Sequence, residues 1–170
     1  MQIGITGVQY FDKYETESWV EETIESRLKE QAQSLPLFGV TSLAVGSDQI
    51  LARKILELGG SLHVVVPFAG YEKAFADQGG VREYHRLLDL AYAVETLPAK
   101  ATDSGSFLAA GKRIVDLSDS VFAVWNGKRK PGEGYAPTTT IVVGYALERN
   151  KPVLQINHIA KHWSWLQDVS

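Results

Sequence analysis

Short apolar runs rich in β-branched residues alternate with longer segments of helical period along this sequence. Such alternation is typical of repeated β-α units, which build a largely parallel sheet with helices packed on its faces. The sequence therefore predicts a single α/β domain over residues 1–170, with a mostly parallel sheet of about six strands. The expected strands are 2–6, 42–45, 62–66, 94–97, 120–125 and 153–156.

The segments between these strands carry the helical signal. In 16–34 the apolar residues Trp19, Val20, Ile24 and Leu28 recur at spacings that place them on one stripe of a helix. Further helices are expected between residues 48 and 58 and over 82–93, 105–117 and 138–149, and the segment around Trp163 is expected to form a short helix or an oligomer contact. Strands that alternate with helices in this order predict a Rossmann-like fold of three layers.

Composition narrows the chemistry that this chain can perform. At 170 residues with 45% hydrophobic residues it can bury a substantial core, and the lack of cysteine excludes disulfides, thiolate zinc sites and cysteine nucleophiles. The histidines have no acidic partner at metal spacing, so neither a metal site nor a cofactor is expected. The first residues show no signal peptide and no apolar stretch reaches the roughly 20 residues of a membrane helix, so we expect a cytoplasmic protein.

The charge balance bears on the choice of partner. A formal net charge of −3 gives no global attraction for polyanions, so nucleic acid is not expected as a partner. A local basic cluster, Lys128 to Lys130, suits a small anion better than a duplex.

The carboxyl ends of the parallel strands are where a ligand is expected, near the point at which strand order reverses. Most of the loops that follow the expected strands contain glycine, which lets the backbone approach a ligand, and some of these loops begin helices, whose amino termini favour anions. We therefore predict that the ligand contacts come from these loops. The expected binding residues are Thr6, Gly7, Gly46, Ser47, Asp48, Pro67, Tyr71, Asn126, Gly127, Thr138, Thr139 and Thr140.

Several of these residues have two interpretations. The threonines from Thr138 to Thr140 either donate to a phosphate or cap the helix that begins there. Asp48 either binds a ribose hydroxyl or caps the second helix, and Tyr71 with Phe75 forms either a lid over a base or ordinary packing. Asp119, which precedes a strand at the opposite edge of the sheet, is expected to be structural.

A set of short motifs in a fixed order resembles the SLOG superfamily, which includes the LOG phosphoribohydrolases, DprA/Smf and YpsA-type proteins. The motifs are Gly4-Ile5-Thr6-Gly7, Gly46-Ser47-Asp48, Val66-Pro67-Phe68, Phe107 with Ala110-Gly111, Ser118-Asp119, Ala123-Val124-Trp125-Asn126-Gly127, and Gly144-Tyr145-Ala146 with Lys151-Pro152-Val153. The resemblance covers most of the chain. It implies a nucleotide, nucleoside or ADP-ribose-like ligand and often a homodimer.

The chain also departs from the superfamily pattern. Val8 and Gln9 stand where His-Arg often follows the first glycine motif, and Pro137-Thr138-Thr139 replaces a Gly-Gly-Thr phosphate cradle. The Pro-Gly-Gly-x-Gly-Thr motif and catalytic Glu of the LOG hydrolases are absent. The ending also resembles nucleoside deoxyribosyltransferases, but Val142 occupies the position of their nucleophilic Glu, and valine cannot attack an anomeric carbon.

These observations leave three functional classes open. The first is a sensor or carrier that binds a nucleotide or a nucleotide-derived small molecule, with no reaction required. The second is a hydrolase of an N-glycosidic or phosphoester bond, in which Glu133 or Asp48 serves as general acid or base. The third is a non-catalytic interaction protein, in which the C-terminal tryptophans hold an oligomer together. DNA binding, as in DprA/Smf, is the least expected inheritance because the chain is net acidic.

Overall fold

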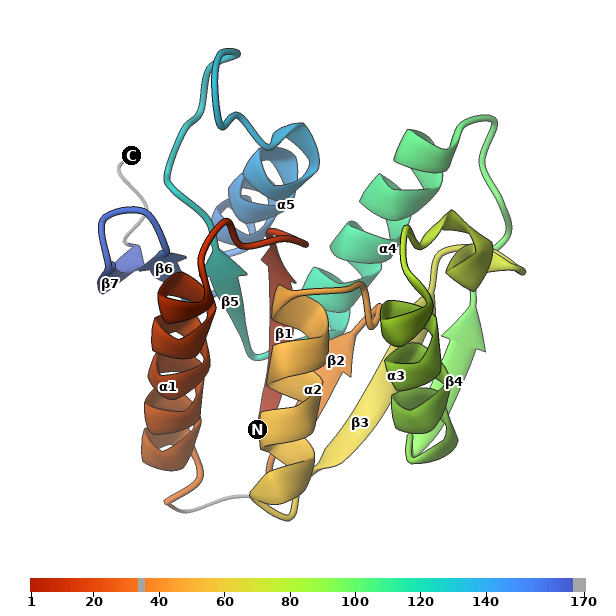
Figure 1. Cartoon of the computed structure of the whole chain (residues 1–170), viewed down its shortest axis with the longest axis horizontal. Helices are drawn as coiled ribbons and strands as arrows, with labels where there is room; N and C mark the ends of the chain where they lie inside the picture. The colour runs from red at the N-terminus through yellow and green to blue at the C-terminus, as the bar shows by residue number, and fades with distance from the viewer. Residues whose placement is uncertain (34–35, 167–170) are drawn as a thin grey trace.

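A computed structural model describes residues 1–33 and 36–166 of the chain and shows a sheet of seven strands in the order β4-β3-β2-β1-β5-β6-β7 (Figure 1). All neighbouring pairs are parallel except β6 with β7. The expected α/β fold with a mostly parallel sheet is confirmed. The strands are β1 Gln2–Gly7, β2 Phe38–Thr41, β3 Ser61–Val66, β4 Ala93–Thr96, β5 Ser120–Val124, β6 Val153–Asn157 and β7 His162–Leu166.

Helices cover both faces of the sheet, as a three-layer fold requires. Figure 1 shows α1 (Tyr14–Gln31), α2 (Ser47–Glu57) and α3 (Gln78–Asp89) on one face, while α4 (Asp103–Leu117) and α5 (Pro137–Glu148) pack together on the other. A 3-10 turn, η1 (Tyr71–Ala74), precedes α3. Within the described ranges, no helix combines the length and the apolar character needed to span a membrane.

The core explains why the central elements form where they do. Every residue of β5 is buried, as expected for a strand covered on both faces. On α1 the predicted stripe of Val20, Ile24 and Leu28 is fully buried against the sheet, although the helix starts at Tyr14 rather than 16. The expected end of this helix at Ser34 lies outside the described residues.

The second strand lies earlier in the chain than expected. Residues 38–41 pair with both β1 and β3, and the segment 42–45 that we expected to be the strand forms the connection to α2. Gly39 lies inside β2, where a Cβ would come within 3.1 Å of Ile55 and Leu62. The glycine therefore allows α2 to approach the sheet closely.

The C-terminal segment is a strand and not the expected short helix. Residues His162–Leu166 pair antiparallel with β6, with Trp163 opposite Ile156 and Trp165 opposite Leu154. Arg27 of α1 stacks on the Trp163 ring at 4.1 Å. The two tryptophans alternate with polar residues at the period of a strand, and this period-2 pattern outweighs the helical interpretation.

Candidate functional site

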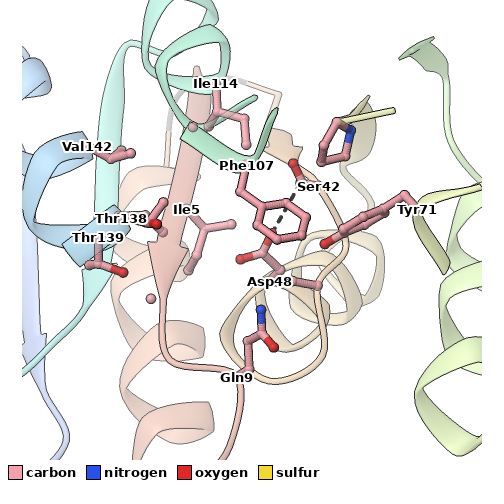
Figure 2. A pocket seen from close by; sticks show the side chains of 15 residues that line it. Ile5, Gln9, Ser42, Asp48, Tyr71, Phe107, Ile114, Thr138, Thr139 and Val142 are labelled. Carbon is pink, nitrogen blue, oxygen red and sulfur yellow. Dashed lines mark hydrogen bonds between the residues drawn. The ribbon is translucent and has the colours of Figure 1, made fainter. Parts of the chain in front are cut away.

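A cavity of about 140 Å³ opens at the carboxyl edge of the sheet, over the end of β1 and beside the helix α5 that follows β5, the neighbour of β1 (Figure 2). This is the point at which strand order reverses, because β2, β3 and β4 continue to one side of β1 while β5, β6 and β7 lie on the other. The lining residues are Ile5, Thr6, Gly7, Gln9, Ser42, Ala44, Asp48, Pro67, Tyr71, Phe107, Gly111, Ile114, Thr138, Thr139 and Val142.

Asp48 is the charged residue of this lining. It lies in the first turn of α2 and is only 7% exposed. Its Oδ2 accepts a hydrogen bond from Thr41 Oγ1 at 3.0 Å. It also accepts one from Ser42 N at 3.2 Å, which Figure 2 shows as a dashed line. Burial raises the pKa of Asp48 from 3.8 to about 6, and these two hydrogen bonds oppose the rise. Asp48 can therefore exchange a proton near neutral pH.

The interpretation of Asp48 as the cap of α2 is wrong, because Asp48 lies within the first turn and not at the N-cap position. The N-cap residue of α2 is Gly46, which has a positive φ of 87° and no side chain that could form a capping hydrogen bond. A Cβ at Gly46 would lie 2.4 Å from Gln9 O, so the β1–α1 connection rests directly on this turn. Ser47 strengthens the same contact, because its Oγ donates to Val8 O at 2.7 Å.

The first turn of α5 forms the opposite wall. Pro137 is the first residue of the helix, and the N-cap Ala136 has no side chain able to cap it. The hydroxyls of Thr138 and Thr139 line the cavity, and within the described part of the chain neither has a hydrogen-bond partner in the protein. The backbone amides at this end of a helix also lack intrahelical acceptors. This wall consequently presents donors and a positive helix terminus to the cavity.

Aromatic rings close the side of the cavity next to α3. The Tyr71 ring, 4% exposed, makes edge contacts with Phe68, Phe75, Tyr84 and Phe107 at centroid distances between 5.0 and 6.0 Å. Burial, followed by the charge of nearby Asp48, holds the pKa of Tyr71 well above its usual range. Tyr71 lines the cavity with its hydroxyl toward Asp48, as Figure 2 shows. Phe75 does not line the cavity but packs against the Tyr71 ring.

The expected binding residues divide between this cavity and its surroundings. The cavity brings together Thr6, Gly7, Asp48, Pro67, Tyr71, Thr138 and Thr139. Three of the others stabilise the loop between β5 and α5 instead. Asn126 Nδ2 donates to Gly134 O at 2.9 Å, and Thr140 Oγ1 donates to Ala136 O at 2.8 Å. Gly127 adopts a positive φ of 83° in the same loop. Gly46 and Ser47 support the β1–α1 connection, as described above.

The two carboxylates considered as general acid or base also separate. Glu133 is exposed in the loop between β5 and α5 and does not line the cavity, whereas Asp48 does. Asp119, expected to be structural, accepts a hydrogen bond from Gln2 N at 2.7 Å at the other edge of the sheet. Only Asp48 among these three acids lies where a ligand would bind.

Sequence reasoning did not find several lining residues, chiefly Gln9, Ser42 and Gly111. Gln9 follows the first glycine turn by two positions, so its place after β1 was the available signal. Gly111 lies against Val142, whose Cγ2 would be 2.5 Å from a Cβ at 111. This close approach brings α4 and α5 together at the cavity. Val142 itself lines the cavity, so the position of the transferase nucleophile is apolar here.

A second hollow of about 270 Å³ lies between the start of α1 and the β6–β7 turn. Its lining is mostly exposed and consists of Tyr10, Asp12, Lys13, Thr16, His158 and Ile159. One atom of this lining, His158 Nδ1, is buried without a hydrogen-bond partner, but no side chain that lines the hollow is buried as a whole, in contrast to Asp48 and Thr139 of the first cavity. The cavity at the end of β1 is therefore the better candidate for a specific site.

No protein-family model matches the sequence, and comparison with curated proteins gives no significant match. Solved structures do match. DNA processing protein A from Helicobacter pylori, described for its single-stranded DNA binding mode, aligns with a TM-score of 0.60 at 17% identity, over 91% of this chain and 64% of that chain. DprA from Streptococcus pneumoniae aligns with a TM-score of 0.63 at 18% identity, over 91% and 49%. The Moco carrier protein of Chlamydomonas reinhardtii aligns with a TM-score of 0.53 at 17% identity, over 92% and 75%.

These matches correct one expectation and confirm another. The chain spans 64% and 49% of the two DNA processing proteins. The expectation that nucleic acid is not a partner was wrong in its reasoning, because the Helicobacter protein, which shares this fold, binds single-stranded DNA. Net charge describes the whole surface, whereas the exposed Lys128, Arg129 and Lys130 lie together on one loop. At these identities the likeness concerns the fold alone, and it supports the Rossmann-like α/β fold that the sequence predicted.

Proposed function

We propose that this chain binds a nucleotide or a nucleotide-derived small molecule in the cavity at the end of β1, in a sensor or carrier role. The observation that carries the proposal is the pairing of two walls of opposite character at the switch point of the sheet. The Asp48 wall accepts hydrogen bonds, and the first turn of α5 donates them. A nucleotide has both complements, because its sugar hydroxyls donate and its phosphate is an anion.

Thermal unfolding at fixed protein concentration tests this proposal. Purified protein is heated with AMP, ADP, ATP, NAD, ADP-ribose, cyclic nucleotides and nucleosides in turn, since a ligand that prefers the native state raises Tm. At 100 times Kd, a ligand adds about 2.7 kcal/mol to the stability. We expect at least one nucleotide to raise Tm in a concentration-dependent manner. A flat Tm for the whole panel would overturn the proposal.

A neighbouring pair of threonines supplies the matched variants. Thr139→Val removes a buried hydroxyl that faces the cavity, whereas Thr140→Val removes a hydroxyl that bonds Ala136 O and Lys128 O outside it. The ligand-induced rise in Tm is expected to shrink in Thr139→Val and to persist in Thr140→Val. Equal effects in both variants would place the ligand elsewhere.

Chromatography of the same mixtures distinguishes a carrier from a hydrolase. A sensor or carrier returns the ligand intact after prolonged incubation. Release of free base or inorganic phosphate, lost in Asp48→Asn, would instead assign Asp48 as a general acid or base, a role that its pKa of about 6 permits.

A second candidate ligand is single-stranded nucleic acid. The exposed basic cluster of Lys128, Arg129 and Lys130 favours it, because this loop connects β5 to the helix whose first turn lines the cavity. Fluorescence anisotropy of a labelled oligothymidylate over a range of salt concentrations tests this candidate. Arg129→Ala with Lys130→Ala is expected to lower the salt slope by about 1.4, since each of the two lost phosphate contacts on a single strand contributes about 0.7. Affinity that is the same in the variant would exclude this loop as the contact.

A further inference from the structure

The connection between β2 and α2, residues 42–46, forms one wall of the cavity and contains a strained residue. Ser42 and Ala44 line the cavity, and Leu43 between them is fully buried with a left-handed φ of 57°. A left-handed conformation is unfavourable for a residue with a Cβ and persists only where surrounding contacts hold it. The conformation of this turn therefore depends on its neighbours.

Hydrogen bonds from two side chains of α2 hold the turn. Thr41 Oγ1 accepts from Leu43 N at 2.9 Å and donates to Asp48 Oδ2 at 3.0 Å, so one hydroxyl links the carboxylate of the cavity to the strained residue. Gln49 is buried, and its Nε2 donates to Leu43 O at 3.2 Å and to Gly80 O at 3.1 Å. A chain of hydrogen bonds thus runs from Asp48 through Leu43 to Gly80, in the first turn of α3.

The helix α3 is anchored through residues next to the cavity. Its buried residues are Gly80, Tyr84 and Leu87. Gly80 lies against the turn, because a Cβ at this position would be 2.5 Å from Val45 Cγ2. The Tyr84 ring makes an edge contact at 5.8 Å with the ring of Tyr71, which lines the cavity. Two of the three anchors of α3 therefore contact the cavity wall or the turn that forms it.

We infer that α3 responds to occupancy of the cavity, because a molecule that contacts Asp48 or Tyr71 acts on the contacts that hold this helix in place. This inference rests on the proposed function, in which a sensor needs an element that changes when its ligand binds. A helix at the end of its layer (Figure 1) with three buried residues opens locally at a low cost. A ligand that requires the closed turn suppresses this opening, and α3 affects the affinity for that ligand by the same factor.

Hydrogen exchange measured by mass spectrometry tests the inference, with AMP, ATP, NAD and ADP-ribose as the probes. Exchange of the α3 amides over 81–89 is expected to slow when a probe binds, by up to about hundredfold at 100 times Kd. The control is β7, the edge strand at the other end of the sheet, none of whose residues lines the cavity. Its exchange is expected to stay unchanged. Binding that leaves the exchange of α3 unchanged would overturn the inference while the proposed function stands.

Two adjacent glycines of α3 provide matched variants. Alanine improves the helix propensity at either position, but only at Gly80 does the new Cβ strike the turn. At Gly79 the nearest atom to a Cβ is Asp77 Oδ1 at 3.1 Å, in the N-cap residue of the same helix. Gly80→Ala is expected to weaken the binding of the probe at least about fivefold, and Gly79→Ala to leave it unchanged. Equal affinities in the two variants would contradict the coupling.

A carbon-13 NMR titration of the Asp48 carboxyl gives a readout that needs no ligand. Asp48 and Tyr71 are the titratable residues of the described lining, so the titration of Asp48 reports on this wall. Burial raises the pKa of Asp48 to about 6. Withdrawal of α3 from the turn admits water, so this pKa is expected to fall toward 3.8 in Gly80→Ala and to stay near 6 in Gly79→Ala.

The outcomes of the titration separate this inference from the proposed function. If the pKa of Asp48 is the same in the two variants, the turn does not couple α3 to the cavity and the inference is wrong. If the pKa falls in Gly80→Ala alone but none of the probes binds, α3 is coupled to the cavity while the proposed function fails.

Discussion

Replacement of Asp48 by asparagine is expected to stabilise the folded protein in a pH-dependent manner. Asparagine has nearly the same shape, and its side-chain oxygen can accept the bonds from Thr41 Oγ1 and Ser42 N. It carries no charge at any pH, so the cost of burying a carboxylate disappears. The variant isolates the effect of the charge from the effect of packing.

The magnitude follows from the two pKa values. An aspartate in the unfolded chain ionises near 3.8, whereas Asp48 in the fold ionises at about 6 because it is buried. The folded state holds the proton more tightly, so the stability contributed by this group is present below pH 3.8 and is lost as pH rises through about 6. The difference between the two pKa values corresponds to about 3 kcal/mol. This is the upper limit of the gain in Asp48→Asn at pH 8.

Urea denaturation at pH values between 4 and 8 measures this gain. The free energy of unfolding of Asp48→Asn minus that of the wild type is expected to be small at pH 4 and to rise by about 3 kcal/mol by pH 8. Asp89→Asn is the control, because Asp89 is exposed at the end of α3 and does not line the cavity. A difference for Asp48→Asn that is constant across this pH range would refute the reasoning.

Three further variants test the packing around the site and the helices. Gly46→Ala is expected to lower the free energy of unfolding by about 2 kcal/mol or more, because its φ is 87° and a Cβ would lie 2.4 Å from Gln9 O; an unchanged denaturation midpoint would contradict this. Lys54→Met is expected to cost about 1 kcal/mol at low salt and less in 1 M NaCl, since it removes the ion-pair partner of Glu21 and Glu57 and leaves Glu25 with Lys29 alone; a salt-independent loss would point to packing instead. Arg27→Ala is expected to cost less than about 1 kcal/mol and to shift the tryptophan emission by uncovering the Trp163 ring; an unshifted emission spectrum would count against the stacking.

The layers of the fold were predictable because they rest on local patterns. The strands β3 and β5 read as apolar runs, and the structure places them over 61–66 and 120–124, within one residue of the expected bounds. Both are interior strands. All of β5 is buried, and in β3 only Ser61 and His63 are half-buried, so burial and an apolar sequence largely coincide. The stripe on α1 was equally local, since a period of 3.6 is set by the helix itself.

The second strand could not be placed from its own sequence. The sequence predicts a strand over 42–45, yet β2 begins at Phe38, level with Gln2 of β1 and Ser61 of β3. Pairing with two neighbours fixes this register, and neither neighbour is visible in a local window. The shift has a consequence for the site, because it frees Ser42 N from the strand to bond Asp48 Oδ2 at 3.2 Å.

The position of the cavity was predictable, but the composition of its lining was not. The switch-point rule depends only on strand order, which the β-α alternation implied. Which side chains enter the cavity depends on how closely the helices approach, and that is decided by contacts between distant segments. Gly111 is an example: in sequence it is a small residue of a helix, but a Cβ there would lie 2.5 Å from Val142 Cγ2 on α5. Because 111 is glycine, α4 and α5 approach closely enough to line one cavity together, and this approach places Phe107 of α4 in the lining with Thr139 of α5.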